Sequence, residues 1–165
     1  TPAMSDAQQS IADDLGAVGR TKLSECERKH LLAAWGVATE ESTIIGTEVA
    51  IGVKRDDQLG PVLMYGMGGI FAEMTTEVTL RVCPISKQDA QDMVNEVAGS
   101  RILIGSNGRP KADVDSLIDT LVRVSELAVN LEGIIDEINI NPLIVLPRGQ
   151  GVKALEAVIT LSHQQ

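Results

Sequence analysis

The pattern of hydrophobic and polar positions changes period along the chain. Apolar residues recur every three or four positions within 113–130, which predicts an amphipathic helix there, and start and stop signals predict two further helices near 25–35 and 87–98. Elsewhere, runs rich in β-branched residues stand between turns that contain glycine or proline, which is typical of strands. The strands are predicted within 43–56, 62–66, 70–82, 134–146 and 152–161.

Residues near the helix ends support two of these assignments. Ser24 with Glu27 three positions later, and Ser86 with Asp89, have the spacing of a capping box. Gly36 follows the first predicted helix, where a glycine commonly ends the helical geometry. The segment 101–110 is predicted to be a short strand or a turn.

The order of elements predicts the fold class. Strands follow one another in groups that short turns connect, so we expect a mainly antiparallel sheet with helices on one face, an α+β fold. Residues 23–162 are predicted to form the domain. Residues 1–22 are Ser-, Ala-, Asp- and Gln-rich and are predicted to be a tail or linker with one loose helix.

Composition narrows the range of partners. The chain has 165 residues and a formal net charge of −9, which argues against a nucleic-acid-binding surface. Its longest apolar runs are far shorter than the ~20 residues that cross a bilayer, so no membrane span is expected. Cys26 and Cys83 are far apart in the sequence, with no metal-ligand spacing and no signal segment before them. We therefore expect a cytoplasmic protein with reduced thiols.

A glycine-rich stretch, "GPVLMYGMGGIFAEMTTE" at 60–77, interrupts the strand-like pattern. Gly66, Gly68 and Gly69 allow a neighbouring group to approach the backbone closely, and Glu73 follows shortly after them. One interpretation is a hairpin with a flexible corner, and the other is a surface that a phosphate with its metal approaches. The motif is not a P-loop, because no Gly-Lys-Ser/Thr follows it.

The last predicted hairpin carries a second candidate pair. The turn at 147–151 would bring Asn141 and Glu156 within cross-strand reach, and such oxygen ligands suit Mg²⁺ when phosphates supply the rest. From spacing alone, an ordinary strand-end turn and a surface Glu are the favoured explanation. His30 and His163 have no evident catalytic partner in the sequence, and no catalytic residue is identified.

Several motifs together resemble one protein family. "LSECERKHLLAAWGV", "EVAIGVKRDDQLGPVLMYGMGGIFAEMTTEVTLRVCPI", "LIGSNGRP" and "EININPLIVLPRGQGVKALEAVITL" resemble, in this order, the ATP-grasp region of the NDP-forming acyl-CoA synthetases. These enzymes are ADP-forming ligases related to the succinyl-CoA synthetase β subunit. The resemblance extends over about residues 23 to 161.

The resemblance implies both a fold and a function. The fold would be the second ATP-grasp subdomain, and the function would be the nucleotide-binding part of a ligase that converts acyl-CoA, NDP and phosphate to acid, CoA and NTP through a phosphohistidine. Asn141 and Glu156 fall on the family's Mg²⁺-ligand positions. Gly66, Gly68, Gly69 and Glu73 fall near the phosphates of ATP or ADP. The implied partner is a CoA-binding subunit or domain.

The sequence also departs from the family. Between Val37 and Thr43 only "ATEES" stands where the family has most of its first subdomain, including the phosphate-binding lysine and the histidine loop. A catalytically inactive interaction or regulatory module on the same scaffold is therefore the alternative. Loss of half of a two-lobed fold would expose apolar surface, so a homo- or hetero-oligomer is expected. Four positions differ from the family's usual residues: Glu156 and Glu77 replace Asp, Asn107 replaces Arg, and Asn139 replaces an acidic residue.

Overall fold

A computed structural model describes residues 3–16, 22–39, 46–68, 77–105 and 111–162. Its α-helices lie close to the predicted segments, and one further helical element, a 3₁₀ helix, appears. The α-helices are α1 (Asp6–Gly16), α2 (Glu25–Ala34), α4 (Lys87–Glu96) and α5 (Val114–Asn130), and η1 (Ala98–Ile104) is a 3₁₀ helix. The strands are β1 (Thr47–Asp56), β2 (Gly60–Met67), β3 (Val78–Val82), β4 (Ile135–Val145), β5 (Val152–Ala154) and β6 (Ala157–Leu161).

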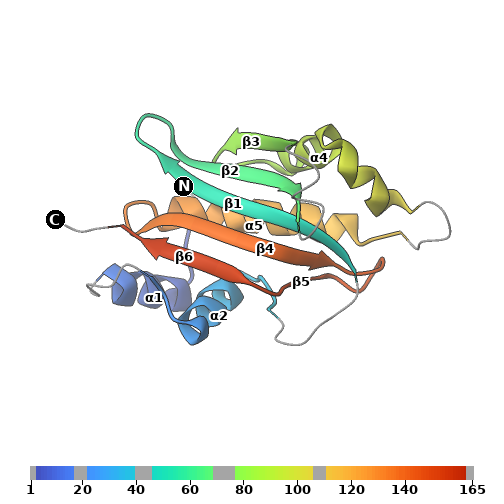
Figure 1. The fold of residues 1–165 in the computed structure, drawn as a ribbon. Helices are drawn as coiled ribbons and strands as arrows, with labels where there is room; N and C mark the ends of the chain where they lie inside the picture. The colour runs from blue at the N-terminus through green and yellow to red at the C-terminus, as the bar shows by residue number, and fades with distance from the viewer. Residues whose placement is uncertain (1–2, 17–21, 40–45, 69–76, 106–110, 163–165) are drawn as a thin grey trace.

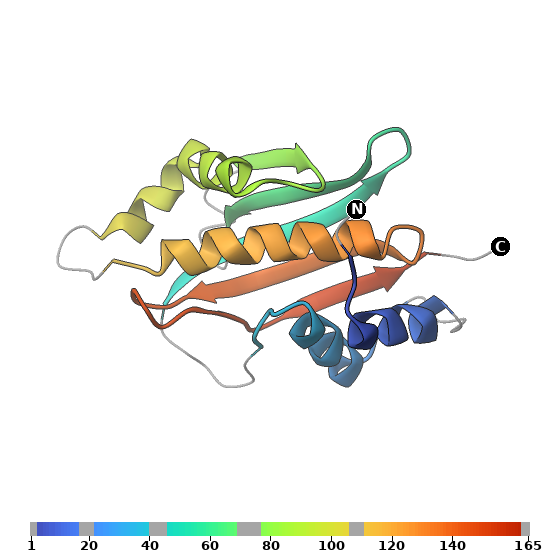
Figure 2. The same ribbon diagram turned by 180° about the vertical axis from the view of Figure 1, so that it is seen from behind.

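The strands form one sheet in which every described pair is antiparallel. The order is β3-β2-β1-β4, and β4 then pairs with β5 at one end and with β6 along the rest of its length. Helices α4 and α5 cover one face of the sheet, as the view from behind shows (Figure 2). Helices α1 and α2 lie beside β6 (Figure 1). The α+β prediction, with a mainly antiparallel sheet and helices on one face, is confirmed.

Alternating side chains on the strands explain why only one face is covered. Val49, Ile51 and Val53 of β1 point toward α5 and are buried, while Lys54, the residue after Val53, points the other way and is exposed. Among the residues that the structure describes, the core contains one buried Tyr and one buried Trp, and is otherwise built from aliphatic residues, Met and Cys. We call the face of the sheet opposite α4 and α5 the open face.

The helix starts follow the capping signals in the sequence. Ser24 accepts a hydrogen bond from the Glu27 backbone N–H, and the Glu27 carboxylate accepts one from the Ser24 N–H. Ser86 and Asp89 form the same reciprocal pair at the start of α4. Each pair satisfies backbone donors that the first helical turn would leave without partners.

Two element predictions need correction. The segment at 101–110 is not a strand where it is described, because residues up to Ile104 belong to η1. The single strand predicted at 152–161 is divided into β5 and β6 by a bend at Leu155 and Glu156. The part of the predicted strand at 70–82 that precedes residue 77 lies outside the described residues.

The N-terminal segment contacts the core. Ala12 and Leu15 of α1 are buried, and the Gln8 side chain donates a hydrogen bond of 2.9 Å to the Ala34 carbonyl of α2. The loose helix expected within residues 1–22 is therefore packed along one side, while the domain boundary at residue 23 stays a prediction. Within the described residues, no helix has both the length and the apolar character needed to cross a bilayer.

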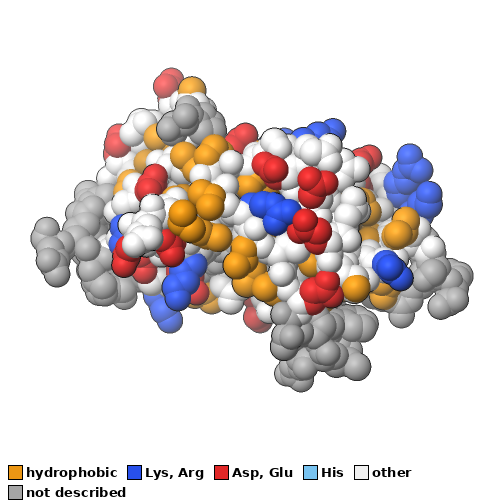
Figure 3. Space-filling view, turned by 90° about the horizontal axis from the view of Figure 1, so that it is seen from above, with side chains coloured by type: hydrophobic (Ala, Val, Ile, Leu, Met, Phe, Trp, Pro, Cys, Tyr) orange, Lys and Arg blue, Asp and Glu red, His pale blue; other side chains and the backbone are white. Residues whose placement is uncertain are grey.

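Apolar side chains also lie on the surface around β3. Val78, Leu80 and Val82 alternate along this edge strand on the open face, and each is exposed. The view from above Figure 1, the side on which β3 lies, shows apolar side chains gathered among acidic and basic ones (Figure 3). An exposed group of apolar side chains of this kind is typical of an interaction surface.

Candidate functional site

Asn141 and Glu156 lie side by side where β4 meets the bend between β5 and β6. The Asn141 backbone N–H donates a hydrogen bond of 3.1 Å to the Glu156 carbonyl, and the Leu155 N–H donates one of 3.1 Å to the Pro142 carbonyl. These bonds hold the two residues across the ladder at the point where the strand bends. Glu156 is exposed and Asn141 is partly exposed, so solvent reaches both positions. The cross-strand approach predicted from the hairpin is therefore present in the backbone.

Gly68 lies against Asn141 of this pair. A side-chain carbon placed on Gly68 would lie 3.0 Å from the Asn141 Oδ1 and 2.5 Å from the Val49 carbonyl oxygen. The Gly68 N–H also donates a hydrogen bond of 3.1 Å to the Glu48 carbonyl. Glycine is required here because backbone and amide groups approach from two sides. Gly68 and Asn141, which are 73 residues apart in the sequence, thus lie next to each other.

Gly66 has a different environment. It lies within β2, paired with Ala50 and Val78, and a side chain there would contact Val78 at 3.0 Å and the Glu77 carbonyl at 3.2 Å. Neither Gly66 nor Gly68 has a positive φ, so neither forms a left-handed turn. Gly69 and Glu73 lie outside the described residues, and their predicted roles near the phosphates stay predictions.

The chemistry of the pair suits a hard divalent cation. A carboxylate and an amide oxygen are the kinds of ligand that Mg²⁺ takes, usually together with water and phosphate oxygens. Among the residues that the structure describes, no group of three His, Cys, Asp or Glu side chains gathers as a complete metal site. The fit is therefore to a metal that arrives with its own phosphate ligands, and the ligand assignment of Asn141 and Glu156 stays a prediction.

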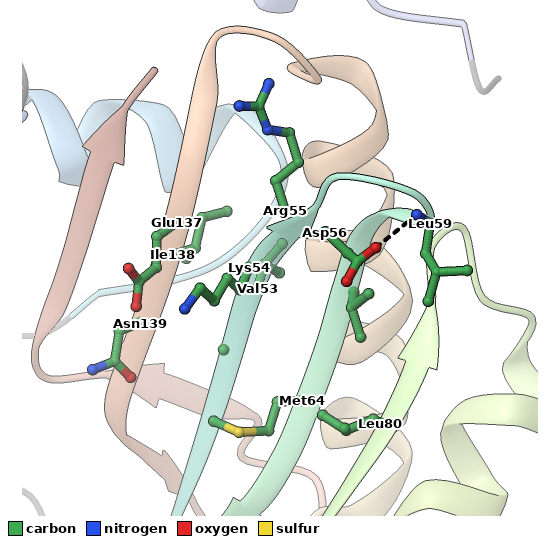
Figure 4. A pocket seen from close by; sticks show the side chains of 12 residues that line it. Val53, Lys54, Arg55, Asp56, Leu59, Met64, Leu80, Glu137, Ile138 and Asn139 are labelled. Carbon is green, nitrogen blue, oxygen red and sulfur yellow. Dashed lines mark hydrogen bonds between the residues drawn. The ribbon is translucent and has the colours of Figure 1, made fainter. Parts of the chain in front are cut away.

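A depression of about 650 Å³ lies farther along the open face. Gly52, which has no side chain, is one of its lining residues. Met64 and Leu80 form an apolar wall (Figure 4). Opposite them, Lys54 of β1 extends toward Glu137 and Asn139 of β4 (Figure 4). Asn139 is two positions before Asn141 on the same strand, so the depression borders the candidate site.

Lys54 and Glu137 are not predicted as site residues from the sequence. They are direct partners in the β1–β4 register, which joins segments more than 80 residues apart. The only signal in the sequence is the alternation on β1 and β4, which assigns each residue to a face but not to a partner.

Tyr65, the aromatic residue of the glycine motif, faces away from the site. Its side chain is buried, and its hydroxyl lies 2.6 Å from the Ser100 hydroxyl of η1. Burial raises the pKa of Tyr65 to about 12, although the hydrogen bond to Ser100 opposes this rise. Tyr65 thus anchors η1 below the sheet and stays neutral at physiological pH.

The β1–β2 hairpin is closed by Asp56. Its carboxylate accepts backbone hydrogen bonds from Gln58 at 2.8 Å and from Leu59 at 2.9 Å, and the second bond is drawn in Figure 4. The bonds from Leu59 and Gln58 lower the pKa of the Asp56 carboxyl, so it is charged at neutral pH. This turn fixes Leu59 at the rim of the depression.

Comparisons with known proteins support the predicted relationship. The family model described as "ATP-grasp domain" matches residues 36–161. The acetate–CoA ligase [ADP-forming] II subunit beta of Pyrococcus furiosus is 40% identical over 116 residues, which cover 70% of this chain and 49% of the relative. The 4-hydroxybutyrate–CoA ligase [ADP-forming] of Nitrosopumilus maritimus is 33% identical over 126 residues, which cover 76% of this chain and 18% of the relative.

A solved structure has the same fold. It is the dinucleotide-forming acetyl-coenzyme A synthetase 1 of Ca. Korarchaeum cryptofilum, in complex with coenzyme A and Mg-AMPPCP and with its phosphohistidine segment pointing towards the nucleotide binding site. It is 25% identical with a TM-score of 0.84, and the match covers 94% of this chain and 100% of that chain. This chain spans about half the length of the acetate–CoA ligase subunit described above.

Proposed function

Because this chain belongs to the ATP-grasp domain family, we propose that it supplies the magnesium- and nucleotide-facing surface of an ADP-forming acyl-CoA synthetase. The observation that carries the proposal is the meeting of Gly68, Asn141 and Glu156 at one end of the open face. The side-chain oxygens of Asn141 and Glu156 suit a magnesium ion that carries a polyphosphate. The absence of a side chain at Gly68 lets such a group approach the backbone closely. The Mg-AMPPCP complex of the structural relative supports the same ligand class.

Each residue has a distinct role in this proposal. Glu156 contributes a negative charge and Asn141 a neutral oxygen, and together they would hold Mg²⁺ at the bend. Gly68 leaves the space beside the Asn141 amide open. Bound magnesium offsets phosphate charge and aligns the phosphoryl group that is transferred. Gly66, Gly69 and Glu73 are proposed to lie near the phosphates.

The proposed overall reaction converts acyl-CoA, NDP and phosphate to acid, CoA and NTP through a phosphohistidine. Relatives act on acetate and on 4-hydroxybutyrate, which supports an acyl-CoA as the substrate class. The sequence of this chain has two histidines, and His30 lies exposed on α2. The phosphohistidine and the CoA site are therefore proposed to come from a partner subunit or domain, as the subunit name of the P. furiosus relative supports.

We further propose that the protein acts in the cytoplasm. Its nucleotide and CoA substrates are intracellular metabolites, and the described cysteines, Cys26 and Cys83, are both free thiols. Burial raises the pKa of the Cys83 thiol to about 12, with the Leu63 backbone hydrogen bond opposing this rise, so Cys83 is unreactive at neutral pH.

Titration of the full chain with Mg·ADP tests the nucleotide site. We expect binding that requires Mg²⁺ and weakens by roughly one to two decades in Glu156→Ala, since a lost charge-assisted contact costs ~1.5–3 kcal/mol. Isothermal calorimetry measures both affinities. Glu132→Ala, which removes an exposed carboxylate from the turn before β4, is the matched control and should bind as the parent does.

Two results would contradict the proposal. Equal affinity in the parent and in Glu156→Ala would remove the metal assignment. Absence of Mg·ADP binding at millimolar nucleotide would instead favour a non-catalytic interaction module on the ATP-grasp scaffold.

A further inference from the structure

A second groove lies beside Glu156, on the side away from the depression of Figure 4. It has a volume of about 410 Å³ and separates the first turns of α2 from the bend between β5 and β6. Figures 1 and 2 both show α2 running beside these strands. The groove is lined by Arg28 and Lys29 from the helix and by Glu156 from the bend. Two cationic side chains therefore share one hollow with the candidate metal ligand.

Both cations retain the ability to bind an anion. The Arg28 guanidinium uses one N–H to donate a 3.1 Å hydrogen bond to the Leu23 carbonyl, which fixes the side chain and leaves other donors of its planar group. The Lys29 ammonium lies 3.3 Å from the Glu25 carboxylate, whose side chain is 68% exposed. An ion pair this exposed is weak, so it does not prevent Lys29 from contacting a more highly charged group.

The charges of the groove change when a divalent cation binds. Without metal, the groove lining has two cationic side chains, Arg28 and Lys29, and two carboxylates, Glu25 and Glu156, so the charges of the lining cancel. A cation on Glu156 offsets that carboxylate and leaves a positive groove beside the metal. Phosphate oxygens could then contact the metal and the two side chains at once.

We propose that Arg28 and Lys29 bind a phosphate group of the magnesium-bound nucleotide. This inference rests on the proposed function and assigns the phosphate contacts to α2 of this chain. It rests on the geometry of this chain, because Arg28 and Lys29 of α2 line the same groove as Glu156. The helix that carries the two cations thus adjoins the sheet that carries Glu156.

Magnesium pyrophosphate is the probe that isolates the phosphate contacts from any contact with the base or ribose. Calorimetry on the full chain should show Mg²⁺-dependent pyrophosphate binding that Lys29→Gln weakens roughly ten-fold or more. Lys29→Arg should restore most of the affinity, because it keeps the charge. Lys87→Gln, at the exposed start of α4, removes the same charge elsewhere and should leave the affinity unchanged.

Arg28 is tested by two substitutions of different chemistry. Arg28→Gln should weaken pyrophosphate binding as Lys29→Gln does, and Arg28→Lys should recover part of the loss because it retains charge without the planar donors. The buried Trp35 at the end of α2 reports by fluorescence whether each variant keeps the helix packed.

The outcomes separate this inference from the proposed function. Mg·ADP and pyrophosphate binding that weaken in Glu156→Ala but not in Lys29→Gln or Arg28→Gln would overturn the α2 contacts and leave the metal site standing. Pyrophosphate binding that depends on Lys29 but not on Glu156 or Mg²⁺ would overturn the metal site and the proposal that the contacts belong to it. We expect pyrophosphate binding to weaken in Glu156→Ala, Lys29→Gln and Arg28→Gln, and to be unchanged in Lys87→Gln.

Discussion

Asp113 connects two segments that are distant in the sequence. Its Oδ1 accepts the Ser116 N–H at 3.2 Å at the start of α5, and its Oδ2 accepts the N–H groups of Gly149 and Gly151 at 3.1 and 2.8 Å. Burial alone raises the pKa of the Asp113 carboxyl, but the hydrogen bonds from Gly151, Ser116 and Gly149 together hold it below its usual value. One carboxylate thereby fixes both the helix start and the turn before β5.

The lowered pKa predicts the sign of a pH effect. Since the folded-state pKa is lower than the unfolded one, the charged Asp113 stabilises the protein above the unfolded pKa, and this contribution is lost as pH falls through the folded pKa. Asp113→Asn replaces one acceptor by an amide donor and should lower the free energy of unfolding by about 1–3 kcal/mol at neutral pH. The difference from the parent should shrink below pH ~4.

Urea unfolding followed by Trp35 fluorescence measures this difference at each pH. Asp115→Asn removes a carboxylate from the same helical turn, but Asp115 is exposed and should matter far less. Equal stability of Asp113→Asn and Asp115→Asn across the pH range would show that the three backbone bonds contribute nothing.

Secondary-structure elements could be predicted from the sequence where their signals are local. The starts of α2 and α4 follow from Ser24 and Ser86, because the capping bonds involve residues only three positions apart. The bend at Leu155 could not be predicted, since it depends on pairing of that residue with Pro142 on another strand. The buried side of α1 likewise depends on its contact with α2, and not on its own weak apolar stripe.

The candidate site could be predicted only in part for the same reason. Asn141 and Glu156 are joined by a short turn, so their approach follows from a hairpin pattern. Gly68 reaches Asn141 only because β1 lies between β2 and β4, and that order is a property of the whole sheet. The resemblance to a known family supplied what local signals do not contain.

The contact of Gly68 with two strands predicts a strong effect of a single methyl group. In Gly68→Ala the new carbon would lie 2.5 Å from the Val49 carbonyl oxygen, which is backbone and cannot turn aside. We expect a loss of about 1–3 kcal/mol in unfolding free energy and weaker Mg·ADP binding, because Asn141 must also shift. Thermal unfolding and calorimetry measure the two effects.

Gly52→Ala is the matched control within the same sheet. Its new carbon would lie 3.1 Å from the Met64 Cε, the end of a flexible side chain that can move. Its effect on stability should be clearly smaller, and its effect on Mg·ADP binding absent. A Gly68→Ala variant as stable as Gly52→Ala would show that the end of β2 can move away from β1 without loss.

For the molecule as a whole, the uncovered face of the sheet is the dominant feature. Leu80, Met64, Gly52, Asn139 and Val158 are successive register partners across five strands, so they form one row across this face, with apolar side chains at both ends of the row. Helices cover the opposite face, and in the part of the chain that the structure describes no helix covers this one (Figure 1). A large exposed sheet face with apolar side chains is expected to pair with another protein surface.

Self-association through this face is the expected behaviour of the chain by itself. Leu80 is 55% exposed at the edge of the sheet, and Leu80→Glu would place a charge within the apolar surface, where burial without a partner is unfavourable. Sedimentation velocity should therefore show a concentration-dependent oligomer for the parent and a shift toward monomer for Leu80→Glu. Ile104→Glu changes a residue of similar exposure, 61%, on η1 and should leave the parent's association unchanged. If the parent is monomeric over a wide concentration range, or if both variants dissociate alike, the open face is not the surface through which copies of this chain associate.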